Sequence, residues 1–158
     1  QKYALVASLV SQFRVPKQAL VFWRGSESDS CPTLDPIPGV QQEDIVCSAH
    51  KAPARTLGTL EKALAKYPDG GVIVAIVGRS NGLGPILAAR TSWPVIAVCA
   101  SMKDFSNDIW SSLRAPSDVP LLIAPDANNA VKSALNILAQ RNPAAYMIRQ
   151  STIELLDP

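Results

Sequence analysis

Charge is scarce in this sequence and is almost evenly divided between the two signs. Of the 158 residues, 18% are charged, and the formal net charge at pH 7 is +2. Nucleic acids and anionic membranes select clustered basic residues, so this balance gives no support for either partner. No apolar run approaches the roughly 18 residues that a membrane-spanning helix needs. We therefore expect no nucleic-acid partner, no membrane partner, no signal peptide and a cytoplasmic location.

Cysteine and histidine are also rare. Three cysteines, Cys31, Cys47 and Cys99, form no C-x-x-C pair and cannot all pair within one chain, which favours a reducing compartment. Cys47 and Cys99 lie in apolar stretches, where buried packing is the expected role. His50 is the only histidine. Because no spacing typical of metal ligands is present, the residues predict no metal site.

What the chain does contain is a series of short apolar runs. The run from Val72 to Val77 shows almost no polar alternation, which is typical of a strand covered on both faces in a parallel sheet. Similar runs predict strands at 19–23, 44–47, 94–98 and 119–123. Patterns with helical spacing predict helices at 2–13, 53–66, 85–91, 108–113, 128–139 and 144–155. Pro85 is expected at the first position of its helix.

Strands that alternate with helices on short connections predict an α/β fold with a parallel sheet and right-handed crossovers. With 47% hydrophobic residues, the chain can bury one sizeable core, so we expect one main domain. The connection at 30–41 breaks the alternation, because Pro32, Pro36 and Pro38 exclude a long helix there. We expect at most one helical turn after Asp29.

Polar clusters follow three of the predicted strands, at 25–29, 48–51 and 78–85. The carboxyl ends of parallel strands lie on one edge of a sheet, so these loops should meet. Hydroxyls, backbone N–H groups of glycine-rich turns and Lys51 suit an anion such as a phosphate, and Asp29 could accept hydrogen bonds from ribose hydroxyls. His50 belongs to the side-chain type that exchanges protons near neutral pH, so it is the candidate proton carrier.

The loop at 78–85 agrees only in part with the requirements of two familiar motifs. The segment from Gly78 to Gly82 matches the G-x-S-x-G pattern of serine hydrolases. In that fold the histidine follows the serine, whereas His50 precedes Ser80, so we expect Ser80 to be a loop donor. The glycines here do not form G-x-G-x-x-G, and dinucleotide binding therefore has little support.

Four ordered motifs resemble those of the aminoimidazole ribonucleotide (AIR) carboxylases. They are G-S-E-S-D at 25–29, S-A-H-K-A-P at 48–53, G-R-S-N-G-L-G-P at 78–85 and D-I-W-S-S-L-R-A-P-S at 108–117. The third motif resembles the class II enzymes that use carbon dioxide directly, as in the animal bifunctional enzyme fused to SAICAR synthetase. Residues 1–15 resemble the helical segment that joins the two domains of that enzyme, which leaves 16–158 as the AIR carboxylase-like domain.

The resemblance implies a three-layer, flavodoxin-like, parallel five-stranded sheet with helices on both faces. It implies carboxylation of AIR at C4 in purine biosynthesis, with a nucleotide and carbon dioxide as small-molecule partners and no ATP, biotin, metal or other cofactor. It also implies a homo-oligomer, usually an octamer, and fusion to a SAICAR synthetase domain as one arrangement. The apolar faces of the first and last predicted helices independently favour a homo-oligomer over a monomer.

Carried over motif by motif, the resemblance implies a role for each loop. His50 would carry the proton. The substrate phosphate and ribose would be bound by Ser26, Ser28, Asp29, Ser48 and Lys51. The carbon dioxide and base pocket would be formed by Gly78, Arg79, Ser80, Asn81, Gly82 and Leu83.

The proline-rich connection at 30–41 replaces a helix that members of this family normally have, with its N-terminus facing the phosphate. A helix N-terminus supplies free N–H donors and a partial positive charge. We therefore expect a weakened nucleotide site. The alternative function is a non-catalytic relative that serves as a scaffold or nucleotide-binding module.

Overall fold

The computed structural model describes residues 2, 5, 6 and 15–158. The expected leading helix at 2–13, with its interpretation as a linker, therefore lies largely outside the described residues. The described strands are β1 (Gln18–Arg24), β2 (Val40–Val46), β3 (Gly71–Val77), β4 (Val95–Cys99) and β5 (Leu121–Ala124). The helices are α2 (Pro53–Lys66), α3 (Leu83–Ala88), η1 (Ser106–Ile109), α4 (Trp110–Leu113), α5 (Ala127–Leu138) and α6 (Pro143–Glu154).

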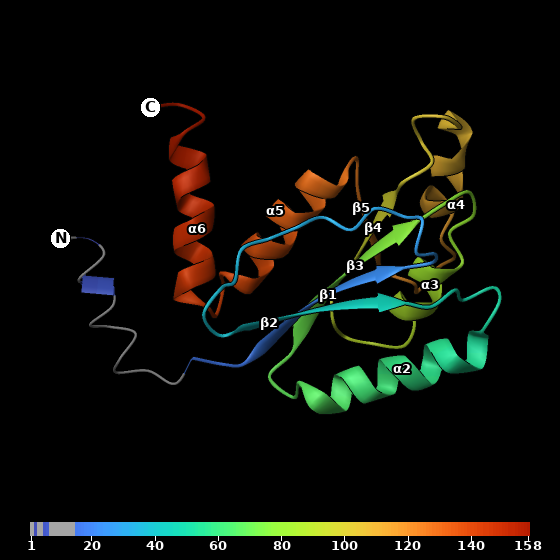
Figure 1. The fold of residues 1–158 in the computed structure, drawn as a ribbon, viewed down its shortest axis with the longest axis horizontal. Coiled ribbons are helices and arrows are strands. Elements are labelled where there is room, and N and C mark those ends of the chain that lie inside the picture. Colours follow the sequence, from blue (N-terminus) through green and yellow to red (C-terminus); the bar gives the residue numbers. More distant parts are fainter. Residues whose placement is uncertain (1, 3–4, 7–14) are drawn as a thin grey trace.

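The strands form one sheet in the order β2-β1-β3-β4-β5, and every neighbouring pair is parallel. This is the flavodoxin-like order: the chain places β2 on one side of β1 and then places β3, β4 and β5 in turn on the other side. The arrowheads of β1, β2 and β3 point the same way in Figure 1. The expected five-stranded parallel sheet is confirmed, and the loops after these strands share one edge.

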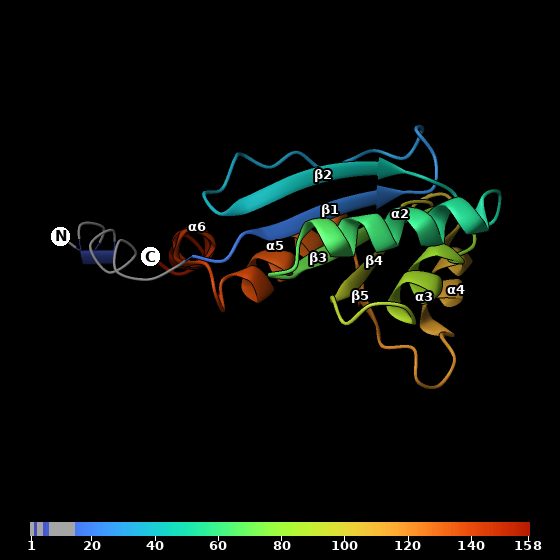
Figure 2. The same cartoon turned by 90° about the horizontal axis from the view of Figure 1, so that it is seen from below.

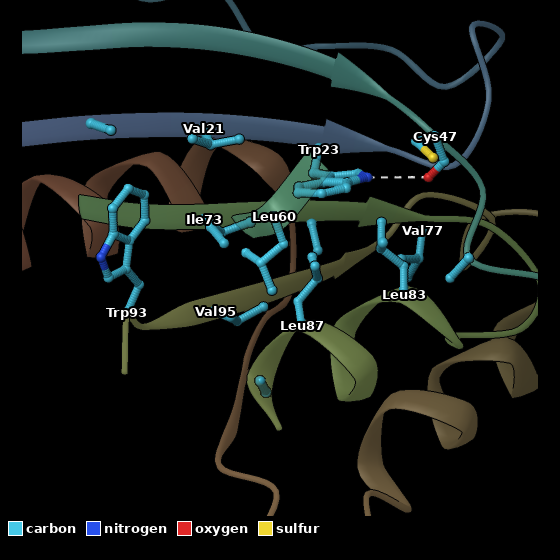
Figure 3. Close-up of a cluster of buried hydrophobic side chains, with 14 of the residues drawn as sticks. Val21, Trp23, Cys47, Leu60, Ile73, Val77, Leu83, Leu87, Trp93 and Val95 are labelled. Carbon is cyan, nitrogen blue, oxygen red and sulfur yellow. Dashed lines mark hydrogen bonds between the residues drawn. The ribbon is translucent and has the colours of Figure 1, made fainter. Parts of the chain in front are cut away.

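Helices cover both faces of the sheet and form two cores. On one face, α2 and α3 bury residues such as Leu60 and Leu87 against Trp23 and Ile73 of the strands (Figure 3). On the other face, α5 buries Leu138 and its neighbours against alternate strand residues. Figure 1 shows α5 above the sheet and α2 below it, and in Figure 2, which is seen from below, α2 lies in front. The three-layer arrangement follows because β1, β3 and β4 are apolar on both faces, with every residue from 72 to 77 buried.

The connection from β1 to β2 has no helix, as its prolines predicted. Residues 30–37 form neither helix nor strand, and a turn at Pro38 and Gly39 leads into β2. Ile37 is 3% exposed and packs into the core on the α5 side of the sheet, with Cys31 and Leu34 beside it. This irregular segment thus covers part of the sheet that a crossover helix would otherwise cover.

Several element boundaries differ from those expected. The helix predicted from Pro85 begins at Leu83 and ends at Ala88, so Pro85 is its third residue and not its first. Asn81 explains the earlier start, because its side chain accepts a hydrogen bond from Gly84 N at 2.7 Å. β2 begins at Val40, ahead of the expected start. Val40 pairs with Gln18, and each following residue of β2 has a partner in β1. β5 is shifted by two residues at its start.

Cys47 and Cys99 are buried and unpaired, which confirms the expected packing role, and Cys31 is a partly buried free thiol. Cys47 Sγ lies 3.2 Å from Thr56 Oγ1 on α2. In the described part of the chain, no helix has the length and apolar character needed to cross a membrane.

Candidate functional site

A cavity of about 490 Å³ opens at the carboxyl edge of the sheet, where the loops after β1, β2 and β3 meet. Nine of the twelve expected site residues line it. They are Ser26, Asp29, Ser48, His50, Lys51, Gly78, Arg79, Ser80 and Leu83. Gly25, Ala49 and Val77 complete the lining. The tertiary structure thus brings together three segments that are separated by about 20 to 30 residues in the sequence.

The loop after β1 is closed by its own hydrogen bonds. Asp29 Oδ2 accepts a bond from Ser26 N at 3.1 Å, and Asp29 N donates to Ser26 O at 3.2 Å. The Ser28 hydroxyl does not line the cavity but lies 2.9 Å from the Ser26 hydroxyl. The two hydroxyls and one carboxylate therefore form a small polar cluster at the cavity rim.

Arg24, the last residue of β1, connects this loop to the edge strand β2. Its Nε donates to Asp44 Oδ1 at 3.0 Å, and its Nη2 donates to Asp44 Oδ2 at 2.5 Å. Its Nη1 donates to Glu27 O at 3.2 Å and Asp29 O at 2.9 Å. The hydrogen bond with Asp44 raises the pKa of Arg24 above its ordinary value. Neither Arg24 nor Asp44 was expected at the site.

A turn after β2 carries His50 and Lys51. Ser48 stabilises it, because its hydroxyl accepts a bond from Lys51 N at 3.3 Å and its carbonyl accepts one from Ala52 N at 2.9 Å. Both side chains are exposed at the cavity. The turn ends where Pro53 opens α2, so a rigid helix fixes its position.

The loop after β3 approaches the His50 ring closely at Gly82. A Cβ atom on Gly82 would lie 2.6 Å from His50 Cε1 and 2.6 Å from His50 Nε2. Such contacts lie far inside van der Waals separation, so a larger residue would displace the ring. Gly82 does not line the cavity, although it was expected in the pocket wall. Its lack of a side chain instead leaves space for the His50 ring.

The Asn81 side chain is buried and does not line the cavity. It is 6% exposed, and its Nδ2 donates to Ser112 Oγ at 2.9 Å. Its backbone N donates to Ser111 Oγ at 2.9 Å, which ties the loop to α4. Two side-chain hydrogen bonds, to Ser112 Oγ and from Gly84 N, and this backbone bond to Ser111 together hold the loop in place. The D-I-W-S-S motif therefore reaches the site through Ser111 and Ser112, which sequence reasoning did not foresee.

Arg79 extends over the segment that follows β4. Its guanidinium carbon lies 4.1 Å from the centroid of the Phe105 ring, a cation–π contact. Phe105 is 47% exposed. With Lys51, Arg79 places positive charge at the cavity, which suits an anionic ligand. Among the described residues, no group of three or more His, Cys, Asp or Glu side chains is placed to hold a metal ion.

The fold and cavity together define a flavodoxin-like α/β protein with a polar, anion-suited site at the carboxyl edge of its sheet. The AIR carboxylase family model matches residues 26–152. The chain therefore belongs to the AIR carboxylase family.

Curated relatives agree with this assignment. The chain is 38% identical over 157 residues to multifunctional protein ADE2 of Gallus gallus, an alignment that covers 90% of this chain and 33% of that protein. It is 45% identical over 119 residues to the human bifunctional phosphoribosylaminoimidazole carboxylase/phosphoribosylaminoimidazole succinocarboxamide synthetase, covering 73% of this chain and 27% of that one. The chain thus spans a third or less of these two animal proteins.

Shorter relatives and solved structures extend the comparison. Phosphoribosylaminoimidazole carboxylase of Archaeoglobus fulgidus is 35% identical over 99 residues, covering 61% of this chain and 53% of that protein. The crystal structure of Treponema denticola PurE superimposes with a TM-score of 0.74 at 22% identity, covering 87% of this chain and 90% of that one. At that identity the superposition shows the fold alone.

Proposed function

We propose that this chain carboxylates AIR at C4 with carbon dioxide to give 4-carboxy-5-aminoimidazole ribonucleotide in purine biosynthesis. The observation that carries the proposal is the meeting of three loops, at 25–29, 48–51 and 78–83, around one cavity in a member of the AIR carboxylase family. His50 is exposed in that cavity between hydroxyls and cations. A phosphorylated ribose and a neutral heterocycle fit such a lining.

The two ends of the cavity serve different parts of the substrate in this proposal. Ser26, Ser28 and Asp29 hold the phosphate and ribose, with Ser48 and Lys51 adding donors from the next loop. The hydroxyl cluster and the Lys51 ammonium favour this assignment, since phosphate oxygens accept hydrogen bonds and carry charge. The second end is formed by Gly78, Arg79, Ser80 and Leu83, which hold the base and carbon dioxide. Asn81 and Gly82 support that end from behind.

The chemistry needs no cofactor to activate the ring. The aminoimidazole is an enamine-like nucleophile, so electron density from the exocyclic amine allows C4 to form a bond with the carbon of carbon dioxide. A carboxylate results, and Arg79 with loop donors stabilises its charge. His50 then accepts the proton from C4, which restores the aromatic ring. The protein's main contribution is orientation of the two reactants and this single proton transfer.

The expected homo-oligomer also belongs to this proposal. Tyr146, Ile153, Leu155 and Leu156, in α6 and the residues that follow it, are each more than 40% exposed. Burial against a second copy of the chain would remove this apolar surface from water. An octamer, a cytoplasmic location and a connection to a SAICAR synthetase domain complete the proposal. Sedimentation at micromolar concentration tests assembly, because a mass of 16.9 kDa would indicate a monomer.

Incubation of the purified chain with AIR and ¹³C-bicarbonate tests the function directly. Labelled carboxy-AIR is expected by mass spectrometry, and His50→Asn is expected to lower turnover by about 10² to 10⁴-fold, the usual contribution of general acid–base catalysis. Retention of more than about a tenth of wild-type turnover in His50→Asn would contradict its role.

The second candidate, a non-catalytic nucleotide-binding module or scaffold, is favoured by one observation. No helix follows the Ser26 to Asp29 loop, so this loop presents no helix N-terminus to a bound phosphate. Calorimetric titration with AIR separates the two functions. Binding without labelled product in the turnover assay would indicate the module, whereas binding with product would exclude it.

A further inference from the structure

Arg24 makes hydrogen bonds in two directions, and these link parts of the chain that no helix connects. Its backbone is fixed inside the sheet, where it pairs with Val46 on one side and Ile76 on the other. Its side chain is 14% exposed. From this anchored position the guanidinium reaches Asp44 on β2 and the carbonyls of Glu27 and Asp29. The same group therefore contacts both the sheet and the rim of the cavity.

We propose that Arg24, oriented by Asp44, is a positioning residue that holds the Gly25 to Asp29 loop in its substrate-binding conformation; this role rests on the function proposed above. Arg24 does not itself line the cavity, but it contacts Asp29, which does. It acts through the loop that carries Ser26, Ser28 and Asp29.

Sheet geometry explains why Asp44 can orient Arg24. In the register of β1 and β2, Phe22 is opposite Asp44 and Arg24 is opposite Val46. Residues two apart on a strand share a face, so Arg24 and Asp44 are diagonal neighbours on the same face of the sheet. A planar guanidinium with two parallel donors matches the two carboxylate oxygens. The third nitrogen, Nη1, is then directed at the loop.

The loop at 25–29 depends on its contact with Arg24. Its other hydrogen bonds are either within the loop itself or of long donor–acceptor distance. The bonds between Ser26 and Asp29 set the internal shape of the loop but do not attach it to the sheet. Gly25 N donates to Ile76 O at 3.4 Å, which is a long hydrogen bond. Beyond Asp29 the chain has no regular secondary structure and is rich in proline, so no helical ladder holds the far end of the loop. Arg24 supplies the attachment at both Glu27 and Asp29.

Loss of the attachment should affect binding and leave the chemical step alone. When only a fraction of molecules has the loop in its binding conformation, the apparent dissociation constant rises in inverse proportion to that fraction. His50 and Arg79 belong to loops after other strands and keep their positions. The expected signature is a raised KM for AIR with an unchanged kcat.

The test compares Arg24→Met and Arg24→Lys with the matched control Arg149→Met. Arg149 also donates to neighbouring side chains, Asn136 at 2.8 Å and Thr152 at 2.9 Å, but it lies on α6 outside the cavity. Arg24→Met should raise the KM for AIR about tenfold, equivalent to about 1.4 kcal/mol, with kcat within twofold of wild type. Arg24→Lys should not recover the wild-type KM, because one ammonium cannot donate in both directions. Arg149→Met should keep the wild-type KM.

An unchanged KM in Arg24→Met, or an equal rise in Arg149→Met, would overturn the proposal. Hydrogen exchange supplies a second measurement, because amides at 25–31 should exchange faster in Arg24→Met while β1 amides remain protected. If Arg24→Met fails to fold, the milder Asp44→Asn variant takes its place, with a smaller rise in KM expected and no rise contradicting the role.

Calorimetric binding of AIR distinguishes this proposal from the proposed function. A wild-type protein that binds AIR without turnover would refute the carboxylase, and a weaker calorimetric affinity in Arg24→Met would still support positioning by Arg24. Equal affinities in the two proteins, or no binding by the wild type, would overturn it.

Discussion

Gly82 lies directly against the imidazole of His50, so close that a Cβ atom there would be 2.6 Å from Nε2. The loop after β3 therefore sets the position of a side chain from the loop after β2. A glycine is required for this approach because any larger residue would occupy the space of the ring.

Gly82→Ala should lower turnover at least tenfold while the fold remains intact. The backbone at Gly82 has φ −84° and ψ −31°, which alanine adopts without strain, so the effect should come from displacement of His50. Steady-state kinetics and circular dichroism measure the two quantities. Gly58→Ala is the control, since nothing lies within 4 Å of its Cβ position in α2. That change should stabilise the protein by about 0.5 to 1 kcal/mol without altering turnover, and full activity in Gly82→Ala would disprove the steric role.

Asn81→Ala should destabilise the protein by about 2 kcal/mol, because Gly84 N and Ser112 Oγ would lose their buried partner. Urea denaturation measures this difference, and turnover should fall as the loop loses its attachment to α4. Asn128→Ala, an exposed position in the first turn of α5, should change stability by less than about 0.5 kcal/mol. Similar losses in the two variants would show that the buried bonds contribute little.

Trp23→Phe should cost about 2 to 3 kcal/mol of stability. Trp23 is fully buried, and its Nε1 donates to Cys47 O at 3.1 Å (Figure 3). Phenylalanine would leave that carbonyl without its donor and open a small cavity. Trp110→Phe provides the comparison, because Trp110 is 51% exposed and its replacement should be nearly neutral. Thermal or chemical unfolding that ranks the two variants equally would contradict this account.

Glu43 should make a pH-dependent contribution to stability. Burial raises the pKa of Glu43, but hydrogen bonds from Lys66 and Tyr67, with the charge of Lys66, together lower it below its ordinary value. A carboxyl group with a lowered pKa in the folded state stabilises the fold above its unfolded pKa, and this contribution is lost as pH falls through the folded pKa. Glu43→Gln should therefore destabilise the protein by about 1 kcal/mol at pH 7 and by much less near pH 3.

Urea denaturation at both pH values measures the Glu43 effect. Glu61→Gln, an exposed position on α2, is the matched control and should give little change at either pH. A Glu43→Gln difference that stays constant from pH 7 to pH 3 would show that the carboxylate charge contributes nothing.

The main elements of the fold were predictable because their patterns are local. The apolar run from Val72 to Val77 predicted β3 almost to the residue, and Pro53 and Lys66 predicted the bounds of α2. Prolines at 32, 36 and 38 predicted the absence of a crossover helix for a covalent reason, since proline has no N–H to donate. Alternation of strands and helices was enough for a parallel sheet, and with it the meeting of three loops at one edge.

The sequence alone determined the residue types available at the site, namely one histidine, a set of hydroxyls, Lys51 and Arg79. Only the tertiary structure decided that Asn81 is buried against Ser112, that Gly82 faces His50 and that Arg24 pairs with Asp44. These contacts join residues 20 to 32 positions apart in the sequence. Sequence patterns report local spacing, whereas the register of neighbouring strands and the packing of a loop on a distant helix depend on the whole assembled sheet.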